Sequence, residues 1–426
     1  MNWFALTRFC HIRYFRWSLF CALITASFTL SSSAQSSIFN VQNSPSGNPQ
    51  GNTLNAVAAL STSDAWAVGF KNDNNINFSR TLTLHWDGVQ WTDIPSPNPG
   101  SPASCRDSNT GNDLASVATA SANDVWATGF SFTCTSVDLT PMVLHWNGEQ
   151  WKVVRTPALG GNGNSSLNGL AVLAGNNIYA VGYQSASNGA VLTLIEHWDG
   201  KNWTVVPSPN RSATGNLLSA VSANSPTDIW AVGVSVDEPT TSVQTLVEHF
   251  DGAKWKVVPS PNPLSKAFLN QNVLSSVRAV SSNNVTAVGL LRDAGQQREL
   301  TLVEHWNGKK WSIVSSPNQS EAPGSLNALT SVTAVSATDL YAVGFFGNAA
   351  TNGQDETLVE HFDGKNWNII TSPTKGLAQQ LNGAFAIPES SDLLAVGAYS
   401  LPGIDFETGF LQLPKTLALS AEGAVK

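Results

Sequence analysis

The feature that most constrains the fold is a phrase that the chain repeats six times. It consists of histidine, an aromatic residue, Asp or Asn, glycine and, three residues further on, tryptophan. The histidines are His85, His145, His197, His249, His305 and His361, at intervals of 52 to 60 residues. Repeats of this length indicate a solenoid, a propeller or an array, in which small supersecondary structures stack on one another. We number these repeats units 1 to 6 in chain order.

Each unit contains four short stretches rich in Val, Ile, Leu and aromatic residues. In unit 4 they read LSAVSA, DIWAVG, TLVEHF and WKVVPSPN, separated by Gly, Asn, Asp and Pro. Such stretches are typical of β-strands, and they are too short for helices with their own caps. The Asp-Gly or Asn-Gly pair predicts a tight turn after the third strand, because glycine tolerates positive φ. Four strands per unit is the composition of one β-propeller blade.

The two chain ends predict one further blade. After His361 the chain supplies LNGAFAI, DLLAVG and GFLQL, whereas FNVQNSP near the N-terminus aligns Phe39 and Val41 with Trp203 and Val205. We therefore expect an all-β, seven-bladed β-propeller with four antiparallel strands per blade. The N-terminal strand closes the last blade, because an open ring would expose unpaired strand edges.

The expected boundaries follow from this alignment. The propeller occupies residues 35–413, with blades at about 54–98, 114–158, 167–210, 218–262, 274–318, 329–374, and 381–413 together with 38–45. Residues 414–426 form a C-terminal tail without an assigned role. The innermost strands should carry small residues where they converge on the axis. The residues at this position are Ala56, Ser116, Gly169, Ala220, Ser276, Ser331 and Gly383.

Residues 1–34 have the pattern of a secretory signal peptide, with Arg8, Arg13 and Arg16 before an apolar run from Trp17 to Leu30. This run is shorter than the roughly 18 residues that span a bilayer. We therefore expect a secreted, periplasmic or extracellular protein without a transmembrane segment. After removal of three arginines, 19 basic residues remain against 30 acidic ones. This acidic balance argues against nucleic acid as a partner.

Two cysteines remain after residue 34. Cys105 lies between the first and second blades, and Cys134 lies between the second and third strands of the second blade. In an antiparallel blade these two connections share a face of the ring. Because exported proteins form disulfides readily, we expect Cys105 and Cys134 to pair.

The order IYAVG, loop, LIEHWDGKNWTVVPSP resembles the kelch repeat, in which a strand ending in glycine precedes a Glu-x-aromatic-Asp strand, a turn and a tryptophan. Kelch blades usually carry a glycine pair where this chain has single glycines, so the resemblance is to a degenerate form. The single glycines are Gly69, Gly129, Gly182, Gly233, Gly289 and Gly344. The resemblance implies a propeller that often serves as a binding scaffold and occasionally as an enzyme domain. A WD repeat is the competing interpretation, although its blades are usually shorter and lack the paired tryptophans.

The six histidines suggest chemistry, but their place in the third strand spreads them around the ring. We therefore expect no shared metal site, and we assign them a structural hydrogen bond to the residues that begin the second strands. Those residues are Asp64, Asp124, Asn177, Asp228, Asn284 and Asp339. The 13 tryptophans after residue 34 all fall on strand positions of the repeat, where we expect them to pack between blades.

Variable loops gather on one face of the expected ring, and rigid scaffolds commonly bind ligands through such loops. The sequence favours a non-catalytic binding protein without a cofactor, engaging a protein or polysaccharide as a monomer. The candidate ligand-binding residues on this face are Asp73, Asn74, Arg80, Asp107, Asp138, Glu238, Arg292, Asp293 and Asp355. The alternative is a propeller that binds or cleaves glycans with loop carboxylates. Its loop aromatics would be Phe78, Phe132, Tyr183, Phe268 and Phe346.

Overall fold

The computed structural model describes residues 39–45, 51–73, 75–101, 110–160, 163–237, 240–264, 267–351, 353–373, 376, 378–400 and 414–421. The expected signal peptide, residues 1–34, lies outside these ranges. In the described residues, no helix is both long enough and apolar enough to cross a membrane.

Each unit contributes four consecutive strands, as the sequence predicts. Units 1 to 3 contain β2 (Asn52–Ser61), β3 (Asp64–Asp73), β4 (Asn75–Trp86), β5 (Trp91–Asp93), β6 (Gly111–Ser121), β7 (Asp124–Thr133), β8 (Ser136–Trp146), β9 (Trp151–Val154), β10 (Ser165–Ala174), β11 (Asn177–Ser185), β12 (Val191–Trp198) and β13 (Trp203–Val205). Units 4 to 6 contain β14 (Asn216–Ser225), β15 (Asp228–Asp237), β16 (Ser242–Phe250), β17 (Trp255–Val257), β18 (Gln271–Ser281), β19 (Asn284–Asp293), β20 (Arg298–Trp306), β21 (Trp311–Val314), β22 (Leu326–Ser336), β23 (Asp339–Gly347), β24 (Glu356–Phe362) and β25 (Trp367–Ile369), with a short 3-10 helix at Ala349–Thr351. The chain ends add β1 (Phe39–Gln42), β26 (Ala378–Ala386), β27 (Leu393–Ser400) and β28 (Pro414–Ala421).

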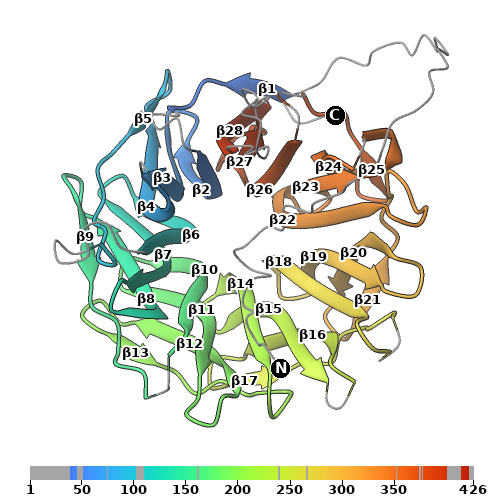
Figure 1. Ribbon diagram of the computed structural model, residues 1–426, viewed down its shortest axis with the longest axis horizontal. Helices are drawn as coiled ribbons and strands as arrows, with labels where there is room; N and C mark the ends of the chain where they lie inside the picture. The colour runs from blue at the N-terminus through green and yellow to red at the C-terminus, as the bar shows by residue number, and fades with distance from the viewer. Residues whose placement is uncertain are drawn as a thin grey trace.

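The strands pair in chain order, so each unit is an antiparallel meander. In the described part of the chain they form five four-stranded sheets and one eight-stranded sheet. The eight-stranded sheet contains the meanders of units 4 and 5, joined by the single parallel pair Val243 and Gln271. Figure 1 shows the sheets arranged around a common centre, with the first strand of each meander nearest to it.

The chain ends meet in one sheet, which we call the closing sheet, with the strand order β1-β28-β27-β26. β1 pairs antiparallel with β28, and Phe39 is 3% exposed. The expected closure by the N-terminal strand is therefore present. The expected third strand was wrong, because β28 occupies this position and residues 409–413 lie outside the described ranges. Residues 414–421 consequently belong to the ring and not to a tail.

The innermost strands share a bulge that explains their small residues. In all seven, the register with the second strand shifts by one residue just before the predicted small position, for example between Leu381 and Gly383. A Cβ added to Gly169 would lie 2.9 Å from the Ala220 Cα of the next sheet, and one added to Gly383 would lie 3.0 Å from the Ala56 Cα. Side chains larger than these would separate the inner strands.

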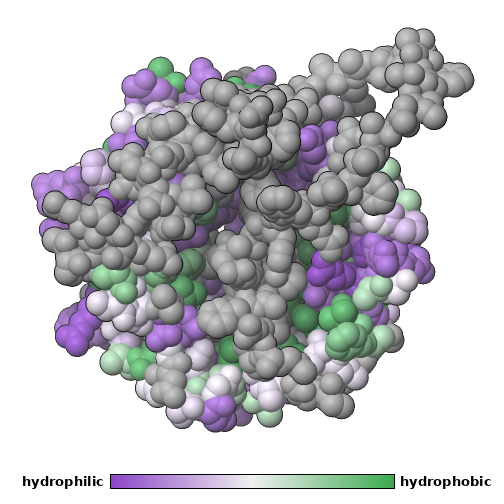
Figure 2. Space-filling model, in the orientation of Figure 1, coloured by the Kyte–Doolittle hydropathy of each residue, from purple (hydrophilic) through white to green (hydrophobic). Residues whose placement is uncertain are grey.

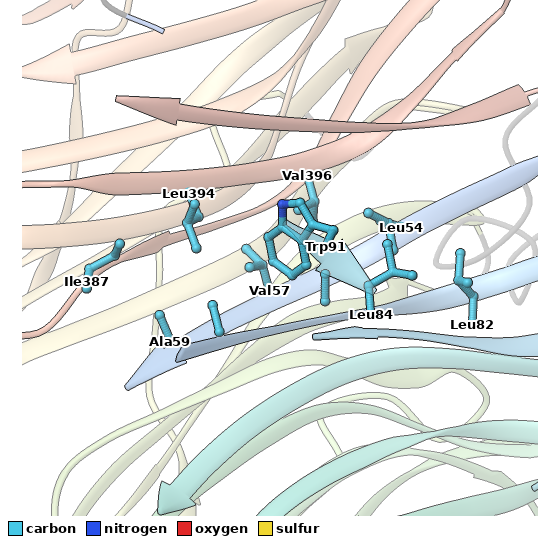
Figure 3. Close-up of a cluster of buried hydrophobic side chains, with 11 residues drawn as sticks. Leu54, Val57, Ala59, Leu82, Leu84, Trp91, Ile387, Leu394 and Val396 are labelled. Atoms are coloured by element: carbon cyan, nitrogen blue, oxygen red, sulfur yellow. The ribbon is translucent and has the colours of Figure 1, made fainter. Parts of the chain in front are cut away.

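Apolar clusters fill the seams between neighbouring sheets. The cluster in Figure 3 joins Leu54, Val57 and Trp91 of unit 1 to Leu394 and Val396 of the closing sheet. Corresponding clusters join each unit to the next, and a further one packs Phe39 and Leu419 against unit 6. The core is therefore a set of seams around the ring, and the seam of Figure 3 connects its first and last sheets.

The turns after the third strands have the expected chemistry. The glycine of each Asp-Gly or Asn-Gly pair has a φ between +87° and +94°. The preceding acid or amide accepts backbone N–H groups of the turn, as when Asp87 Oδ1 accepts from Val89 and Gln90, each at 2.8 Å. These donors hold the pKa of the Asp87 carboxyl below its ordinary value. The sequence phrase thus encodes a self-contained hairpin.

Candidate binding surface

The two ends of the sheets differ in their connections. At one end, which we call the turn face, short turns join the first strand to the second and the third to the fourth. At the other end, the loop face, one to eight residues join the second strand to the third in units 1 to 6, and longer segments join each sheet to the next. In the view of Figure 2, hydrophilic residues gather at the rim, with hydrophobic residues between them.

The six repeated histidines lie near the turn face, and each makes the hydrogen bond that we expected. Their Nε2 atoms lie 2.7 to 3.1 Å from the Oδ1 atoms of the residues that begin the second strands. Five of the rings also pack on an aromatic residue of the second strand, as His249 does on Trp230 at a centroid distance of 4.1 Å. In the described residues, no group of three or more His, Cys, Asp and Glu side chains could hold a metal ion.

The tryptophans pack between sheets. Trp66 is 1% exposed, and its ring lies 5.0 Å from Trp146 and 5.2 Å from Trp151 of the next unit. The fourth-strand tryptophans are only 4 to 6% exposed. These rings therefore join sheets together and do not form an exposed sugar-stacking platform.

In units 1, 3, 4 and 5 a Ser-Pro-Asn segment after the fourth strand anchors the loop face. In unit 3 the Asn210 Oδ1 accepts the backbone N–H of Thr193 at 2.9 Å, and Ser208 Oγ donates to Thr193 Oγ1 at 2.8 Å. The same Asn-to-Thr bond recurs at Asn98, Asn262 and Asn318. The connections that follow units 1, 3, 4 and 5 are thus bonded back to the third strand.

A second set of asparagines, which the sequence reasoning missed, completes this anchoring. The bridging asparagines are Asn112, Asn216, Asn272 and Asn327, all 0 to 1% exposed. The Oδ1 of each accepts a backbone N–H of the preceding connection at 2.7 to 3.1 Å. The Nδ2 of each donates to a third-strand carbonyl of the preceding unit. Their signal in the sequence is an Asn two residues before the Leu of each of these inner strands.

The described candidate residues occupy four different sheets. Arg80 is exposed on β4, and Asp138 is exposed on β8 and accepts from Ser136 Oγ at 3.2 Å. Arg292 forms an ion pair of 2.7 Å with Glu299, and Asp355 accepts a hydrogen bond from Gln380 of the closing sheet. The backbone of Asp73 lies in β3, and Asp293 Oδ1 accepts the N–H of Gln296 at 3.1 Å. The structure distributes these residues around the loop face.

Other expectations on this face fall outside the described residues or need correction. Asn74, Asp107, Glu238 and Cys105 are not among the described residues. Cys134 lies in the turn between β7 and β8, as expected. Of the loop aromatics, Tyr183 and Phe346 are 1% and 8% exposed, so they are core residues because the second strands extend further than predicted. Phe268 alone of these aromatics is strongly exposed in the described part of the chain.

Phe268 and Leu269 form an exposed apolar tip between units 4 and 5, with 69% and 51% of their surface accessible. Their turn is closed by a 3.1 Å hydrogen bond from the Asn270 N–H to the Ala267 carbonyl. Asn270 is 8% exposed, and its carbonyl and side chain accept the N–H groups of Val243 and Ala294. The tip is therefore fixed to both neighbouring units while its side chains face solvent.

Backbone strain concentrates beside this tip. Leu269 has a φ of +65°, and Thr241 and Gln297, in the loops of units 4 and 5, both have a φ of +53°. The fourth non-glycine residue with positive φ among those described is Glu389, on the turn face. Positive φ costs a non-glycine residue about 1 kcal/mol or more and tends to cluster at functional sites. Units 4 and 5 thus carry the strained part of the loop face.

Comparison with known proteins addresses the fold. No protein-family model matches the chain, and no curated protein matches it. Among solved structures, YCF48 bound to a D1 peptide aligns over 91% of this chain and 98% of its own, with 12% identity and a TM-score of 0.53. The chain has a β-propeller fold. The WD40 repeats of RRP9 align over 90% of this chain and 97% of their own, with 12% identity and a TM-score of 0.52. An ulvan lyase with bound saccharide aligns over 89% and 93%, with 9% identity and a TM-score of 0.52.

Proposed function

We propose that this propeller is an exported, non-catalytic binding protein that engages a protein or surface polymer through its loop face. The exposed tip of Phe268 and Leu269 carries this proposal. Folding would bury two large apolar side chains, yet the chain exposes both and holds Leu269 in an unfavourable conformation. Ordered apolar side chains of this kind provide binding energy without a further ordering cost.

The loop face supports the proposal because buried hydrogen bonds fix described parts of its connections. The bridging asparagines and the Ser-Pro-Asn segments tie the connections after units 1, 3, 4 and 5 to a third strand. Propeller neighbours were solved with a peptide and with a saccharide, so both ligand classes are compatible with the fold. We favour a protein over a polysaccharide as the partner for two reasons. The tip is apolar, and the candidate carboxylates, which a glycan-cleaving site would need close together, come from different sheets.

We further propose that the propeller has seven kelch-like blades. The eight-stranded sheet counts as two blades, since one parallel residue pair joins its two complete meanders. The closing sheet supplies the seventh blade. We retain the proposals that residues 1–34 are removed on export and that the mature protein is a monomer. Mass spectrometry and sedimentation of the exported protein test these two points.

We also propose that Cys105 and Cys134 form a disulfide. The supporting observation is that Cys134 lies in the turn between β7 and β8, on the loop face, where the connections between units also run. Export would favour such a bond. A thiol assay on the unfolded, unreduced exported protein should find no free thiol, whereas two reactive thiols would contradict the pairing.

A binding screen tests the proposed function. Purified mature protein is applied to peptide, envelope-protein and glycan arrays, alongside the double variant Phe268→Ser, Leu269→Ser. We expect the variant to bind a protein or peptide ligand at least about tenfold more weakly, as for other buried anchor residues at interfaces. The control is Val89→Ser, which removes an apolar side chain, 83% exposed, from the turn face.

The outcomes of this screen separate the two functions. If Val89→Ser binds normally and the tip variant does not, the loop face is the binding surface. If glycans alone bind, or if product appears during incubation with a polysaccharide, the alternative of a glycan-active propeller replaces our proposal. Unchanged binding by a correctly folded tip variant would remove the tip from the site.

A further inference from the structure

The face of each sheet that looks toward the next unit carries a repeated row of side chains. In unit 4 the row is Ser222, Trp230 and His249, which are directly opposed across β14, β15 and β16. The small first residue leaves room for the aromatic ring, and the ring stacks on the histidine. The rows of units 1, 2 and 3 have the same pattern, with Ala58, Ala118 and Ala171 in the first position.

Unit 5 departs from this pattern at two positions at once. Its row is Arg278, Thr286 and His305, opposed across β18, β19 and β20. Threonine stands where an aromatic ring covers the histidine in unit 4, and arginine stands where unit 4 has a serine. The exchange moves a long side chain into the space beside the missing ring. Packing alone does not require that side chain to carry a charge.

The row of unit 5 contains no acidic residue that could balance the charge of Arg278. Units 1, 2, 4 and 6 have Asp beside the histidine, whereas unit 5 has Asn284, whose Oδ1 lies 3.1 Å from His305 Nε2. Unit 3 also has Asn at this position, but its row carries no cation, so unit 5 alone of the six units combines Arg with a missing acid. Burial lowers the pKa of the His305 imidazole, so this ring is neutral at pH 7 and adds no charge.

Arg278 has no partner of its own in the described part of the chain. Its Nε is buried without a hydrogen bond, and its guanidinium joins no ion pair among the described residues. Burial also lowers the pKa of this guanidinium. Glu360 faces unit 5 from β24, but its Oε2 accepts from Ser316 at 2.8 Å and burial raises its pKa to about 8, so it is uncharged at neutral pH. An unpaired cation in such surroundings is unfavourable.

We propose that Arg278, Thr286 and His305 form an anion-binding site between units 5 and 6, near the turn face. The ligand is a carboxylate or a tetrahedral oxyanion such as phosphate or sulfate. The Arg278 guanidinium supplies the charge and paired N–H donors for two oxygens. The Thr286 hydroxyl adds a neutral donor, and His305 lies on the next strand of the same row. This site is independent of the loop-face tip, so the failure of either proposal leaves the other intact.

Anion-specific stabilisation tests the site. Thermal melts of the full mature protein are compared in acetate, phosphate and sulfate against chloride at matched ionic strength. We expect at least one of the three anions to raise the Tm of the wild-type protein more than that of Arg278→Met. The Tm increase of the variant must be subtracted from that of the wild type, because sulfate and phosphate stabilise proteins in general. The matched control is Arg298→Met, whose arginine already pairs with Glu321 at 3.4 Å.

Two further measurements keep the test decisive. If Arg278→Met does not fold, the double variant Arg278→Ser, Thr286→Trp restores the row of unit 4 and should fold without the anion effect. A bound anion should also raise the pKa of His305, measured by NMR titration, in the wild type but not in the variant. Equal stabilisation of the wild type and a folded Arg278 variant by all three anions would overturn the proposal and indicate adventitious ion effects only.

Discussion

The closing sheet and unit 4 both contain four antiparallel strands, but different interactions hold them together. Unit 4 is one continuous segment with a hydrogen bond between His249 and Asp228, a buried fourth-strand tryptophan, Trp255, and a turn at Gly252. In the closing sheet, Ser420 stands at the histidine position and Phe39 at the tryptophan position. Both keep the inner-strand bulge and its small residue. The bulge and small residue of the inner strand are therefore needed in every sheet. The His, Trp and Gly of the repeated phrase occur only in units that are continuous in sequence.

The largest test of this difference removes the N-terminal strand. Deleting residues 36–45 should sharply lower the Tm, because β28 loses one of its two partner strands and Phe39 leaves an apolar cluster. Burial of the Phe39 side chain alone contributes about 1.5–3 kcal/mol. Calorimetry or chemical denaturation measures the loss, with Val89→Ser as the control. An unchanged melting curve would show that the ring does not depend on closure.

The third strands provide the next test, because they differ at one buried position. Units 3 to 6 carry glutamates there, each fully buried, where units 1 and 2 and the closing sheet carry leucine. The glutamates are Glu196, Glu248, Glu304 and Glu360, and the leucines are Leu84, Leu144 and Leu419. Burial raises the pKa of each glutamate to about 8, and neither oxygen of Glu196 or Glu304 has a partner among the described residues.

These glutamates should make stability fall with rising pH. A folded pKa above the unfolded one means that their contribution is complete below about pH 4.5 and is lost as the pH rises through about 8. Thermal melts between pH 5 and 9 should show this decline, and replacement of all four glutamates by Gln should flatten it. A decline of equal size in the fourfold variant would assign it to other groups.

A smaller effect is expected at the seam between the last and first sheets. Asn382 Nδ2 donates to the Leu54 carbonyl at 2.7 Å, and in the seam between units 3 and 4 Asn168 donates to the Leu218 carbonyl at 2.9 Å. Replacing either residue with Ala leaves a buried carbonyl unpaired, which costs about 1–3 kcal/mol. Denaturant melts compare the two variants. A clearly smaller loss for Asn382→Ala would mean that the closing seam is looser than the contiguous one.

The smallest expected effect is at the outer motif. His197→Ala removes a 2.9 Å hydrogen bond to Asn177 and a ring contact with Tyr179, at a cost of about 1–2 kcal/mol. A double-mutant cycle with Asn177→Ala isolates the hydrogen bond. If His197→Ala abolished a binding or catalytic activity without loss of stability, the structural role of the histidine would be wrong.

The sequence was sufficient for the features that recur in every unit. Strand order, the Gly turns, the histidine bonds and the small inner residues all follow from repeated positions. β28 was missed because PKTLALSA carries neither the histidine nor the tryptophan of the phrase. The tip of Phe268 and Leu269 was not predicted as a site, since its exposure depends on a turn that Asn270 fixes through contacts with β16 and the loop before β20. The loops differ in sequence from unit to unit, so their geometry cannot be inferred by aligning the units with one another.

The pairing of β1 with β28 also orders the events of synthesis. Residues 43–413 separate β1 from its neighbour β28, so a ribosome releases an incomplete ring until β28 has been synthesised. During that interval Phe39 and Val41 lack the apolar residues against which they pack in the complete structure. A chain that terminates before β28 would therefore have an unpaired strand edge.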